Sequence, residues 1–349
     1  MQAKESFANR VLLWAADNGR KLLPWQQQRT AYRVWVSEIM LQQTQVDTVI
    51  PYFQKFMQAF PTIEALATAE QDEVLHYWSG LGYYARARNL HKAAQLIRDS
   101  YQGEFPTDID EVITLPGIGR STAGAILSLS FNHKHTILDG NVKRVLARHQ
   151  AIQGWPGSSA NQKALWAIAE QLTPETDCAD YTQAMMDLGA TLCKRSKPQC
   201  ELCPVSIDCL ALDKGMQNEL PHSKPKKQIP TRKTVMLAIS SDQTGLLMQR
   251  RPNQGIWGGL WSFPEFDSEE SALNWCSRTF QQTPESHQKL DQMTHTFSHF
   301  RLQITPVTVK YSTPIHWVME ADEWVWYKHG SSQVGLAAPV DQLIKQLAI

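Results

Sequence analysis

Residues 115–144 read LPGIGRSTAGAILSLSFNHKHTILDGNVKR. The segment Pro116-Gly-Ile-Gly119 predicts a tight turn between two stretches of helical composition. Its glycines would let the backbone approach a ligand closely, and N–H groups in such a turn, or at the start of the following helix, can bind a phosphate. An ordinary helix–helix turn explains a Gly-x-Gly equally well, so this pattern alone leaves both interpretations open.

Asp139 follows the turn, twenty residues after Gly119 and directly before a helical segment that we place at 141–149. An aspartate in this position is typical of a helix N-cap, because its carboxylate accepts the first free N–H groups of the helix. Capping does not exclude a catalytic role. Both interpretations therefore stay open for this residue.

Four of the six cysteines lie within residues 193–209, with the spacing Cys193-x6-Cys200-x2-Cys203-x5-Cys209. Four thiolates in one short loop suit either a tetrahedral zinc ion or an iron–sulfur cluster. Zinc sites commonly show two tight pairs of cysteines, and here only Cys200 and Cys203 make one. The spacing also differs from that of ferredoxins. These general rules predict a metal site and leave its metal open.

The composition is typical of a folded protein of two domains. The chain has 349 residues, 42% of them hydrophobic. No apolar run approaches the roughly 18 residues of a membrane span, and the polar start is no signal peptide. We therefore expect a soluble, cytoplasmic protein without a disulfide framework, and we assign no role to Cys178 and Cys276.

Charge by itself does not point to nucleic acid, because 34 basic residues balance 34 acidic ones. Any contact with DNA must then come from local groups of basic residues, although such groups are usually just solvated surface. Three groups are candidates: Arg86, Arg88 and Lys92; Lys143, Arg144 and Arg148; and Lys194, Arg195 and Lys197.

The first 220 residues read as a mostly helical domain. Apolar residues between Trp35 and Ile50 recur at helical spacing, and Pro51 is predicted to end that helix. Residues 221–233 are rich in proline and lysine and lack an apolar period, which predicts a linker.

The sequence pattern of residues 234–349 predicts an α+β domain. Alternating apolar residues predict a strand at 301–311, and Pro306 within it favours an edge position in the sheet. The other predicted elements are a hairpin of strands 234–240 and 246–250 around a turn at 242–245, a strand at 323–327, and helices at 268–280 and 339–348.

The turn, the aspartate and the cysteine spacing together resemble the helix-hairpin-helix DNA glycosylase superfamily. The resemblance implies a hairpin at 115–119 whose Gly117 and Gly119 meet DNA, and Asp139 as a catalytic residue. It implies a [4Fe–4S] cluster bound by Cys193, Cys200, Cys203 and Cys209, with Lys194, Arg195 and Lys197 presented to the DNA backbone. Members that also cut the strand carry a lysine where this chain has Ser121. A monofunctional enzyme that uses water as nucleophile is therefore implied.

Four blocks resemble the adenine-specific MutY family within that superfamily: SEIMLQQT (37–44), GLGYYARARN (80–89), ILDGNVKR (137–144) and QAMMDLGA (183–190). They imply that Glu38 is the general acid, although a lone glutamate on an apolar helix usually lies at its exposed edge. They also imply that Gln43 and Tyr83 intercalate at the lesion and that Asn141 assists Asp139. Further implied contacts are Trp25 and Gln183 in the adenine pocket and Lys143 at the DNA; for Trp25 and Tyr83 a plain core role is the alternative.

The chemistry of the implied reaction explains the need for two carboxylates. Adenine is a poor leaving group as an anion, so a ring nitrogen such as N7 must be protonated while the C–N bond breaks. A carboxyl group with a raised pKa can supply that proton. A second, ionised carboxylate can stabilise the oxocarbenium-like sugar. We therefore expect Glu38 to act as acid and later as base, and Asp139 as stabiliser.

The second half resembles a Nudix domain in its Phe263-Pro264 pair and in its mixture of predicted strands and helices. It lacks the metal-binding carboxylates of that fold. Nudix enzymes bind magnesium through the motif Gly-x5-Glu-x7-Arg-Glu-x2-Glu-Glu. When the motif is aligned on Gly259, its first glutamate falls on Glu265, but its Arg-Glu pair falls on Leu273-Asn274 and its Glu-Glu pair on Ser277-Arg278. Residues 295–300, HTFSHF, match the lesion-recognition loop of the adenine-specific family. The resemblance implies that Phe297, Ser298 and His299 recognise 8-oxoguanine, whereas a generic structural loop is the alternative.

These resemblances imply an adenine DNA glycosylase of base excision repair, acting as a monomer in the bacterial cytosol near the nucleoid. Its partner would be duplex DNA with adenine opposite 8-oxoguanine or guanine, and no membrane. Three rivals remain at this point: a glycosylase for oxidised pyrimidines, a non-catalytic iron–sulfur protein that binds DNA or transfers electrons, and a zinc-stabilised binding module.

Overall fold

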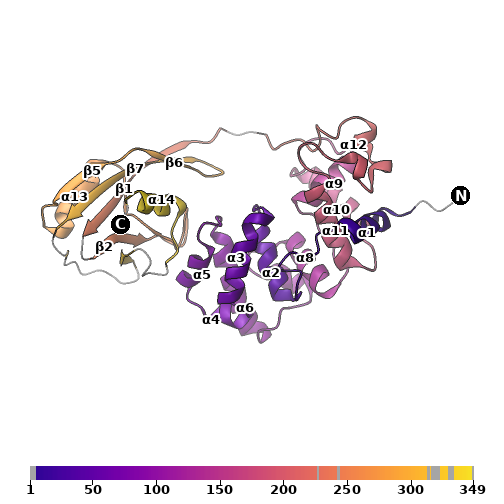
Figure 1. Cartoon of the computed structure of the whole chain (residues 1–349), viewed down its shortest axis with the longest axis horizontal. Helices are drawn as coiled ribbons and strands as arrows, with labels where there is room; N and C mark the ends of the chain where they lie inside the picture. The colour runs from indigo at the N-terminus through magenta and orange to yellow at the C-terminus, as the bar shows by residue number, and fades with distance from the viewer. Residues whose placement is uncertain are drawn as a thin grey trace. The chain divides into compact units, whose positions relative to one another are not determined.

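The computed structural model describes residues 5–225, 228–241, 244–312, 315, 323–328 and 334–347. The chain divides into two compact units, Met1–Thr68 with Asn89–Lys226 and Ala69–Arg88 with Lys227–Ile349 (Figure 1). Among the described helices, none is long and apolar enough to cross a membrane. The domain boundaries predicted at 220 and 234 stay a prediction.

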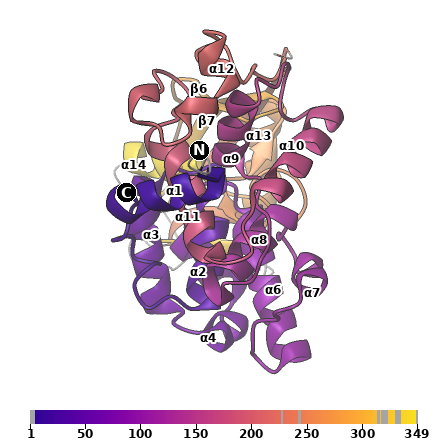
Figure 2. The same cartoon turned by 90° about the vertical axis from the view of Figure 1, so that its right-hand side faces the viewer.

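The first unit is helical. Its helices are α1 (Phe7–Asn18), α2 (Ala31–Leu41), α3 (Val46–Ala59), α4 (Ile63–Thr68), α7 (Ile109–Thr114), α8 (Arg120–Phe131), α9 (Gly140–His149), α10 (Ser159–Leu172), α11 (Cys178–Thr191) and α12 (Leu210–Asp213), with short 3₁₀ turns η1 (Cys200–Leu202) and η2 (Ser206–Asp208). Helix α6 (Ala85–Tyr101) begins in the second unit and continues in the first. Helix α11 packs against α1, α8 and α9, and α2 packs against α8 (Figure 2).

Side-chain caps explain where several of these helices begin. The oxygen of each capping residue accepts a backbone N–H of the first turn, which stabilises the helix by typically about 1 kcal/mol. The capping residues are Ser6, Thr30, Asp108, Asp139 and Ser158. The capping interpretation of Asp139 is thereby confirmed.

The prediction that Pro51 ends a helix is wrong. Pro51 lies inside α3, and the break falls earlier, between α2 and α3. At that break Gln43 has a left-handed backbone, with φ of 58°. An interior proline removes one helical N–H and crowds the preceding turn, which destabilises a helix. Here Val49 and Phe53, on either side of it, are fully buried, and this packing favours the continued helix.

The second unit contains a mixed sheet. Within the described residues the sheet has eight strands, with the order β3-β2-β1-β7-β5, β4 on β1, β6 on β7 and β8 on β2. The strands are β1 (Thr231–Ser241), β2 (Gly245–Arg250), β3 (Trp261–Ser262), β4 (Glu265–Phe266), β5 (Ser286–Lys289), β6 (Met293–Thr296), β7 (Arg301–Tyr311) and β8 (Trp324–Tyr327). The helices are α5 (Gln71–Trp78), α13 (Glu269–Phe280) and α14 (Ala338–Leu347). The predicted strands and helices of this half are confirmed; residues 242 and 243 of the predicted turn lie outside the described residues.

The edge position predicted for the strand with Pro306 is wrong. Strand β7 lies between β1 and β5 and pairs in parallel with β1 along its whole length, from Thr231↔Arg301 to Ser241↔Tyr311. The carbonyl of Pro306 accepts from Leu290 N, so its nitrogen faces the same side. On that side β5 pairs with residues 307–310 and β6 with residues 301–304. Pro306 therefore falls in the gap between two partner strands, where no ladder N–H is needed.

Helix α13 covers one face of this sheet. Its buried Ala272, Cys276 and Phe280 pack in one core with apolar residues of β1 and β7. Cys276 is thus a core residue, and burial raises the pKa of its thiol to about 11. Cys178, in α11, is also buried, and its thiol donates to the Pro174 carbonyl at 3.4 Å.

The segment Ala69–Arg88 belongs to the second unit because polar contacts join it to the sheet domain. The Asp72 carboxylate accepts from Arg250 Nη2 at 2.9 Å and from Trp261 Nε1 at 3.2 Å. At the other end, Arg88 Nη1 donates to the carbonyl of Gly258 at 2.5 Å.

Candidate active site

A cavity of about 810 Å³ in the first unit brings together most of the residues predicted for catalysis and adenine binding. Its volume is within the range of small-molecule sites, roughly 300–1,000 Å³. The predicted residues that line it are Trp25, Glu38, Gln43, Ser121, Asp139, Asn141 and Gln183. They come from five separate parts of the chain, which only tertiary folding could place around one space.

Glu38 lies in α2 between the fully buried Ser37 and the buried Ile39, and its own side chain is half-buried. Its carboxyl makes no hydrogen bond within the described part of the chain. Burial, and secondarily the negative charge of Asp139, raise the pKa of Glu38 to about 8. The carboxyl is therefore mostly protonated at neutral pH, as a general acid must be.

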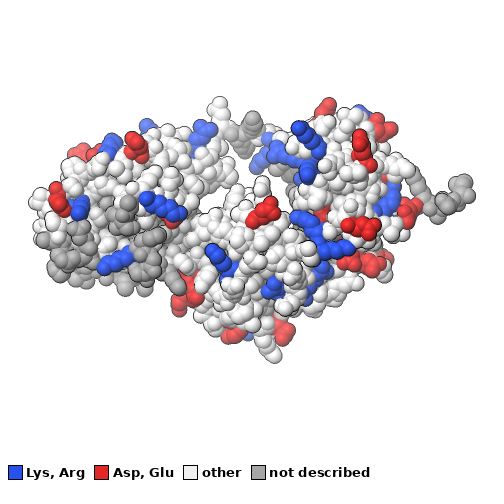
Figure 3. All heavy atoms as spheres, viewed as in Figure 1, with Lys and Arg blue, Asp and Glu red and all other residues white. Residues whose placement is uncertain are grey.

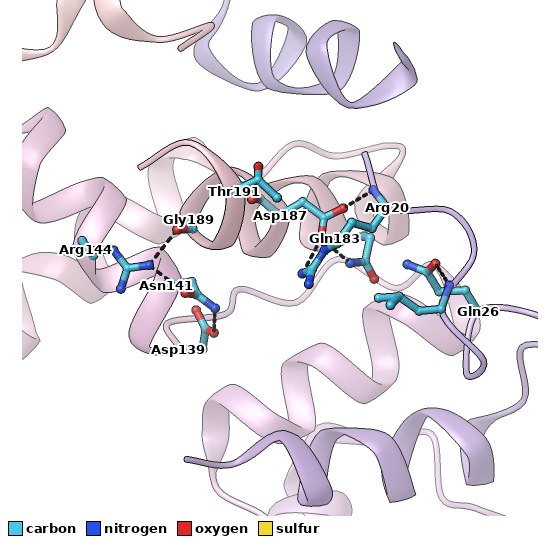
Figure 4. Close-up of polar contacts among 10 residues, drawn as sticks. Arg20, Gln26, Asp139, Asn141, Arg144, Gln183, Asp187, Gly189 and Thr191 are labelled. Carbon is cyan, nitrogen blue, oxygen red and sulfur yellow. Dashed lines mark hydrogen bonds and ion pairs between the residues drawn. The ribbon is translucent and has the colours of Figure 1, made fainter. Parts of the chain in front are cut away.

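Asp139 faces the same cavity in a different environment. Its carboxylate accepts from Val142 N at 2.7 Å and from Asn141 Nδ2 at 3.2 Å (Figure 4). Burial raises the pKa of Asp139 above its usual value, while these N–H donors and the charge of Arg144 lower it. Hydrogen bonds to the charged form thus offset part of the cost of burying an anion here, and within the described residues Glu38 has no such hydrogen bond.

Arg144 was missed as a site residue from the sequence, where it counted only as a candidate DNA contact. Its guanidinium donates to Asn141 Oδ1 at 2.8 Å, to the Gly189 carbonyl at 2.7 Å and to the Cys193 carbonyl at 2.7 Å. Figure 4 shows Arg144 reaching from α9 toward both Asn141 and the end of α11. A Cβ on Gly189 would lie 2.6 Å from Asn141 Cβ, so glycine permits this close approach.

Arg20 and Asp187 were also missed. The Asp187 carboxylate accepts from Gln183 Nε2 at 2.9 Å and from Arg20 Nε at 2.8 Å (Figure 4). Asp187 lies four residues after Gln183, within one of the family-like blocks, which is the signal that could have identified it.

Ser121 joins the hairpin to the segment that carries Asp139. Its hydroxyl accepts from Leu138 N at 2.9 Å, directly before the aspartate. Gly119 caps α8 without a side-chain hydrogen bond, and the space that a Cβ would take there is open. The first N–H groups of α8 are therefore available to an anion. Gly117 has φ of 81°, which favours glycine, and a Cβ there would lie 2.9 Å from Asn89 Cβ.

Gln43 and Tyr83, the predicted intercalating residues, share an unusual backbone conformation. Their φ values are 58° and 50°, in the left-handed region that non-glycine residues rarely adopt. Gln43 lines the cavity, whereas Tyr83 belongs to the second unit. The core alternative is wrong for Tyr83, whose side chain is 53% exposed. Trp25 is buried against Phe53 and also lines the cavity, so both of its predicted roles fit.

The four cysteines of the loop line one cavity of their own. Arg148 Nη1 donates to Cys193 Sγ at 3.3 Å and to the Lys194 carbonyl at 2.6 Å, so it joins α9 to the loop. Burial raises the pKa of Cys203 to about 12. Among the described residues, no group of three or more His, Cys, Asp or Glu side chains could hold a single metal ion.

The sequence overestimated the free basic surface. Arg86 is buried against the carbonyls of the Gly80–Gly82 turn region, Arg88 binds Gly258, and Arg144 and Arg148 bind carbonyls around the cysteine loop. Figure 3 shows small groups of basic side chains interspersed with acidic ones. The residues of the three predicted groups that stay exposed are Lys92, Lys194, Arg195 and Lys197, with Lys143 half-buried.

In the second unit, Phe297, Ser298 and His299 form the turn between β6 and β7, closed by a hydrogen bond from Phe297 N to the Phe300 carbonyl. Ser298 and His299 are exposed. The Phe297 ring stacks on Phe300 at 4.7 Å and contacts Trp257 at 5.2 Å, measured between ring centroids. Phe297 thus anchors the loop, and its two polar neighbours are presented outward.

In the Nudix-like domain, Glu265 is the residue that matches the first glutamate of the Nudix motif. Its carboxylate is paired with the Arg251 guanidinium.

Comparisons with known proteins found matches to both halves of the chain. Residues 36–171 match the model of the HhH-GPD superfamily of base excision DNA repair proteins, and residues 234–346 match that of the NUDIX domain. Adenine DNA glycosylase of Buchnera aphidicola is 41% identical over 98% of this chain and 97% of its own, and that of Homo sapiens is 34% identical over 92% and 70%. A solved structure of a thermostable thymine-DNA glycosylase, 29% identical, covers 60% of this chain and 95% of its own with a TM-score of 0.53.

The predicted superfamily, the fold class of both halves and the enzyme class are thereby confirmed. The chain belongs to the adenine DNA glycosylase family of the HhH-GPD superfamily.

Proposed function

We propose that this protein hydrolyses the N-glycosidic bond of adenine paired with 8-oxoguanine, and also with guanine, in duplex DNA. The observation that carries the proposal is the pair Glu38 and Asp139 on one cavity. Among the described residues Glu38 has no hydrogen-bond partner, whereas Asp139 accepts from N–H donors. The adenine must leave the helix stack to enter such a cavity.

In the proposed reaction the Glu38 carboxyl donates its proton to N7 of adenine while the C–N bond breaks. The bonding electrons leave with the base, and the sugar gains oxocarbenium character. The Asp139 carboxylate stabilises that positive charge electrostatically. Water then attacks the sugar and gives its proton to Glu38, which restores the acid. The products are free adenine and an abasic site.

Asn141 and Ser121 would support this arrangement through their contacts. Asn141 donates to the Asp139 carboxylate and is itself held by Arg144. Ser121 binds the backbone just before Asp139 and has no amine, so it cannot form a Schiff base. A monofunctional glycosylase follows, in contrast to an enzyme for oxidised pyrimidines that also cuts the strand.

DNA would be bound along several elements of the chain. The uncapped start of α8, with Gly117 and Gly119 before it, suits a phosphate. Lys143 and the exposed basic residues of the cysteine loop suit the backbone. Gln43 and Tyr83 would enter the stack at the lesion, and Trp25 and Gln183 would hold the adenine. In the second unit, Phe297, Ser298 and His299 would recognise 8-oxoguanine.

We also propose that Cys193, Cys200, Cys203 and Cys209 bind a [4Fe–4S] cluster. The four thiols line one cavity, and four cysteine thiolates are the donor set that such a cluster takes, with one cysteine on each iron. When bound, such a cluster cross-links the loop and holds it folded. Equal amounts of iron and acid-labile sulfide in the purified protein, without zinc, would support this, and zinc in their place would contradict it.

The decisive experiment measures excision on duplexes with adenine opposite 8-oxoguanine, guanine or thymine. We expect fastest release opposite 8-oxoguanine, slower release opposite guanine and little opposite thymine. Strands should break only after alkali treatment of the abasic product. Strand cleavage without alkali, or excision that ignores the opposite base, would contradict the proposal. A monomeric state and a cytoplasmic location stay predictions.

A further inference from the structure

Asp187 is a charged residue in the interior of the first unit. Its side chain is 1% exposed, although it lies on α11 and lines a second cavity of the first unit together with Arg20 and Gln183. An isolated carboxylate is costly to bury, so its partners must compensate for the lost water. Arg20 does so with its backbone N at 2.8 Å, its Nε at 2.8 Å and its Nη2 at 2.7 Å.

Among the described residues, the carboxylate of Asp187 has one further partner, the side-chain amide of Gln183, whose Nε2 lies 2.9 Å from Asp187 Oδ1. A carboxylate that is paired with arginine can only accept hydrogen bonds, so it must meet the NH₂ group of the amide and not its oxygen. Figure 4 shows the amide nitrogen of Gln183 turned to Asp187 and the amide oxygen turned away from it. The orientation of the amide is therefore determined by chemistry.

Gln183 and Arg20 both line the cavity that holds Glu38 and Asp139. One N–H of the amide donates to Asp187, which holds the nitrogen on that side, so the opposite side of the amide presents its oxygen, an acceptor, to a base in this cavity. An acceptor matches the exocyclic amino group of adenine. It opposes the exocyclic oxygen that hypoxanthine and guanine carry at the same position of the ring.

We propose that Asp187 and Arg20 are positioning residues that determine which base the cavity accepts, because they hold the Gln183 amide with its oxygen toward the base. The inference rests on the adenine pocket of the proposed function. It assigns part of the base specificity to two residues that need not touch the base. One hydrogen bond of this kind changes a rate by roughly 2- to 10-fold.

The test replaces Asp187 by asparagine and compares three bases. An asparagine can present either its NH₂ group or its oxygen, so Gln183 would be free to turn its amide over and donate to an exocyclic oxygen. Single-turnover rates are measured on identical duplexes that carry adenine, hypoxanthine or unsubstituted purine opposite 8-oxoguanine. Purine has only hydrogen at the position in question and reports damage to the rest of the site.

For Asp187→Asn we expect the adenine-to-hypoxanthine rate ratio to fall by roughly tenfold relative to wild type. The purine rate should change much less than this ratio. Arg20→Lys, which alters a partly exposed side chain, should lower the ratio in the same direction but less. If Asp187→Asn yields too little folded protein, the rate ratio of Arg20→Lys tests the inference in its place.

Two controls make the result specific. In Gln183→Leu the ratio should already be lowered, and adding Asp187→Asn should lower it no further, because the two residues act through one contact. Asp72→Asn removes a comparable aspartate–arginine ion pair in the second unit and should leave the ratio unchanged.

An unchanged ratio in Asp187→Asn and Arg20→Lys, or an equal loss on all three bases, would overturn the inference. A wild-type protein that releases no adenine would instead overturn the proposed function itself. The two failures are therefore distinguishable.

Discussion

The catalytic cavity of the first unit and the Phe297–His299 loop of the second differ in how their residues are held. The cavity collects side chains that are far apart in the sequence, from Trp25 to Gln183. The loop consists of three consecutive residues in one turn, and its polar members are exposed.

This difference predicts different sizes of effect. Burial removes water from the carboxyl groups of Glu38 and Asp139, so charges and protons interact more strongly there, because the effective dielectric constant is lower than in water. At an exposed turn, water competes for every hydrogen bond, so each contact contributes little. We therefore expect large losses of rate from changes in the cavity and modest changes of selectivity from changes in the loop.

The largest effect is expected for Glu38→Gln. Glutamine keeps the size of the side chain but cannot donate the proton or later activate water, so the single-turnover rate should fall at least about 10³-fold. Binding to the mispaired duplex, measured by gel mobility shift, should persist. The matched control is Glu64→Gln on the exposed face of α4, which should keep the wild-type rate. Rapid residual excision by Glu38→Gln would refute the assignment.

Asp139→Asn should come second, because it separates the two functions of Asp139. Asparagine caps a helix about as well as aspartate, so α9 and the melting temperature should be preserved. The negative charge is lost, which should lower the excision rate by roughly 10²- to 10³-fold. Asp108→Asn, at the cap of α7, should leave both the melting temperature and the rate unaltered. A variant of Asp139 that loses only stability would show that it caps and does nothing more.

The pH dependence should be the next largest effect. The active form of Glu38 is protonated, and its pKa is raised to about 8. The single-turnover rate should therefore decline above about pH 8 and approach a tenfold loss per further pH unit. Asp139 must be ionised, so the rate should also decline in acid. A profile that stays flat well above pH 8, with DNA binding verified at each pH, would argue against a protonated Glu38.

The smallest effect is expected in the loop. Ser298→Ala with His299→Ala should reduce the preference for adenine opposite 8-oxoguanine over adenine opposite guanine by roughly 2- to 10-fold for each lost hydrogen bond. The rate opposite guanine should hardly change. Thr294→Ala, at an exposed position of the neighbouring β6, is the control and should keep the preference. If the double variant discriminates as well as wild type, the loop is structural.

Local features of the molecule were predictable from the sequence because they depend on neighbours along the chain. The β1–β2 hairpin, α13 behind its Ser268 cap and the Asp139 cap belong to this class. The position of Pro306 in the middle of the sheet was not predictable, because it depends on where two other strands end. The same holds for the bonds from Arg144 to the Gly189 carbonyl and from Arg148 to the Lys194 carbonyl, which join residues 45 and 46 positions apart.

The sequence by itself determined the residue types of the site: two carboxylates, four clustered cysteines, and a serine in place of a lysine. Only the tertiary structure decided the pKa values and the orientations of the side chains in the site. Burial raises the pKa of both carboxyl groups, and only at Asp139 do N–H groups that folding brings near offset part of that rise. The orientation of Gln183 depends on Asp187 and Arg20. Burial and distance in space have no fixed relation to position in the chain, so folding had to supply them.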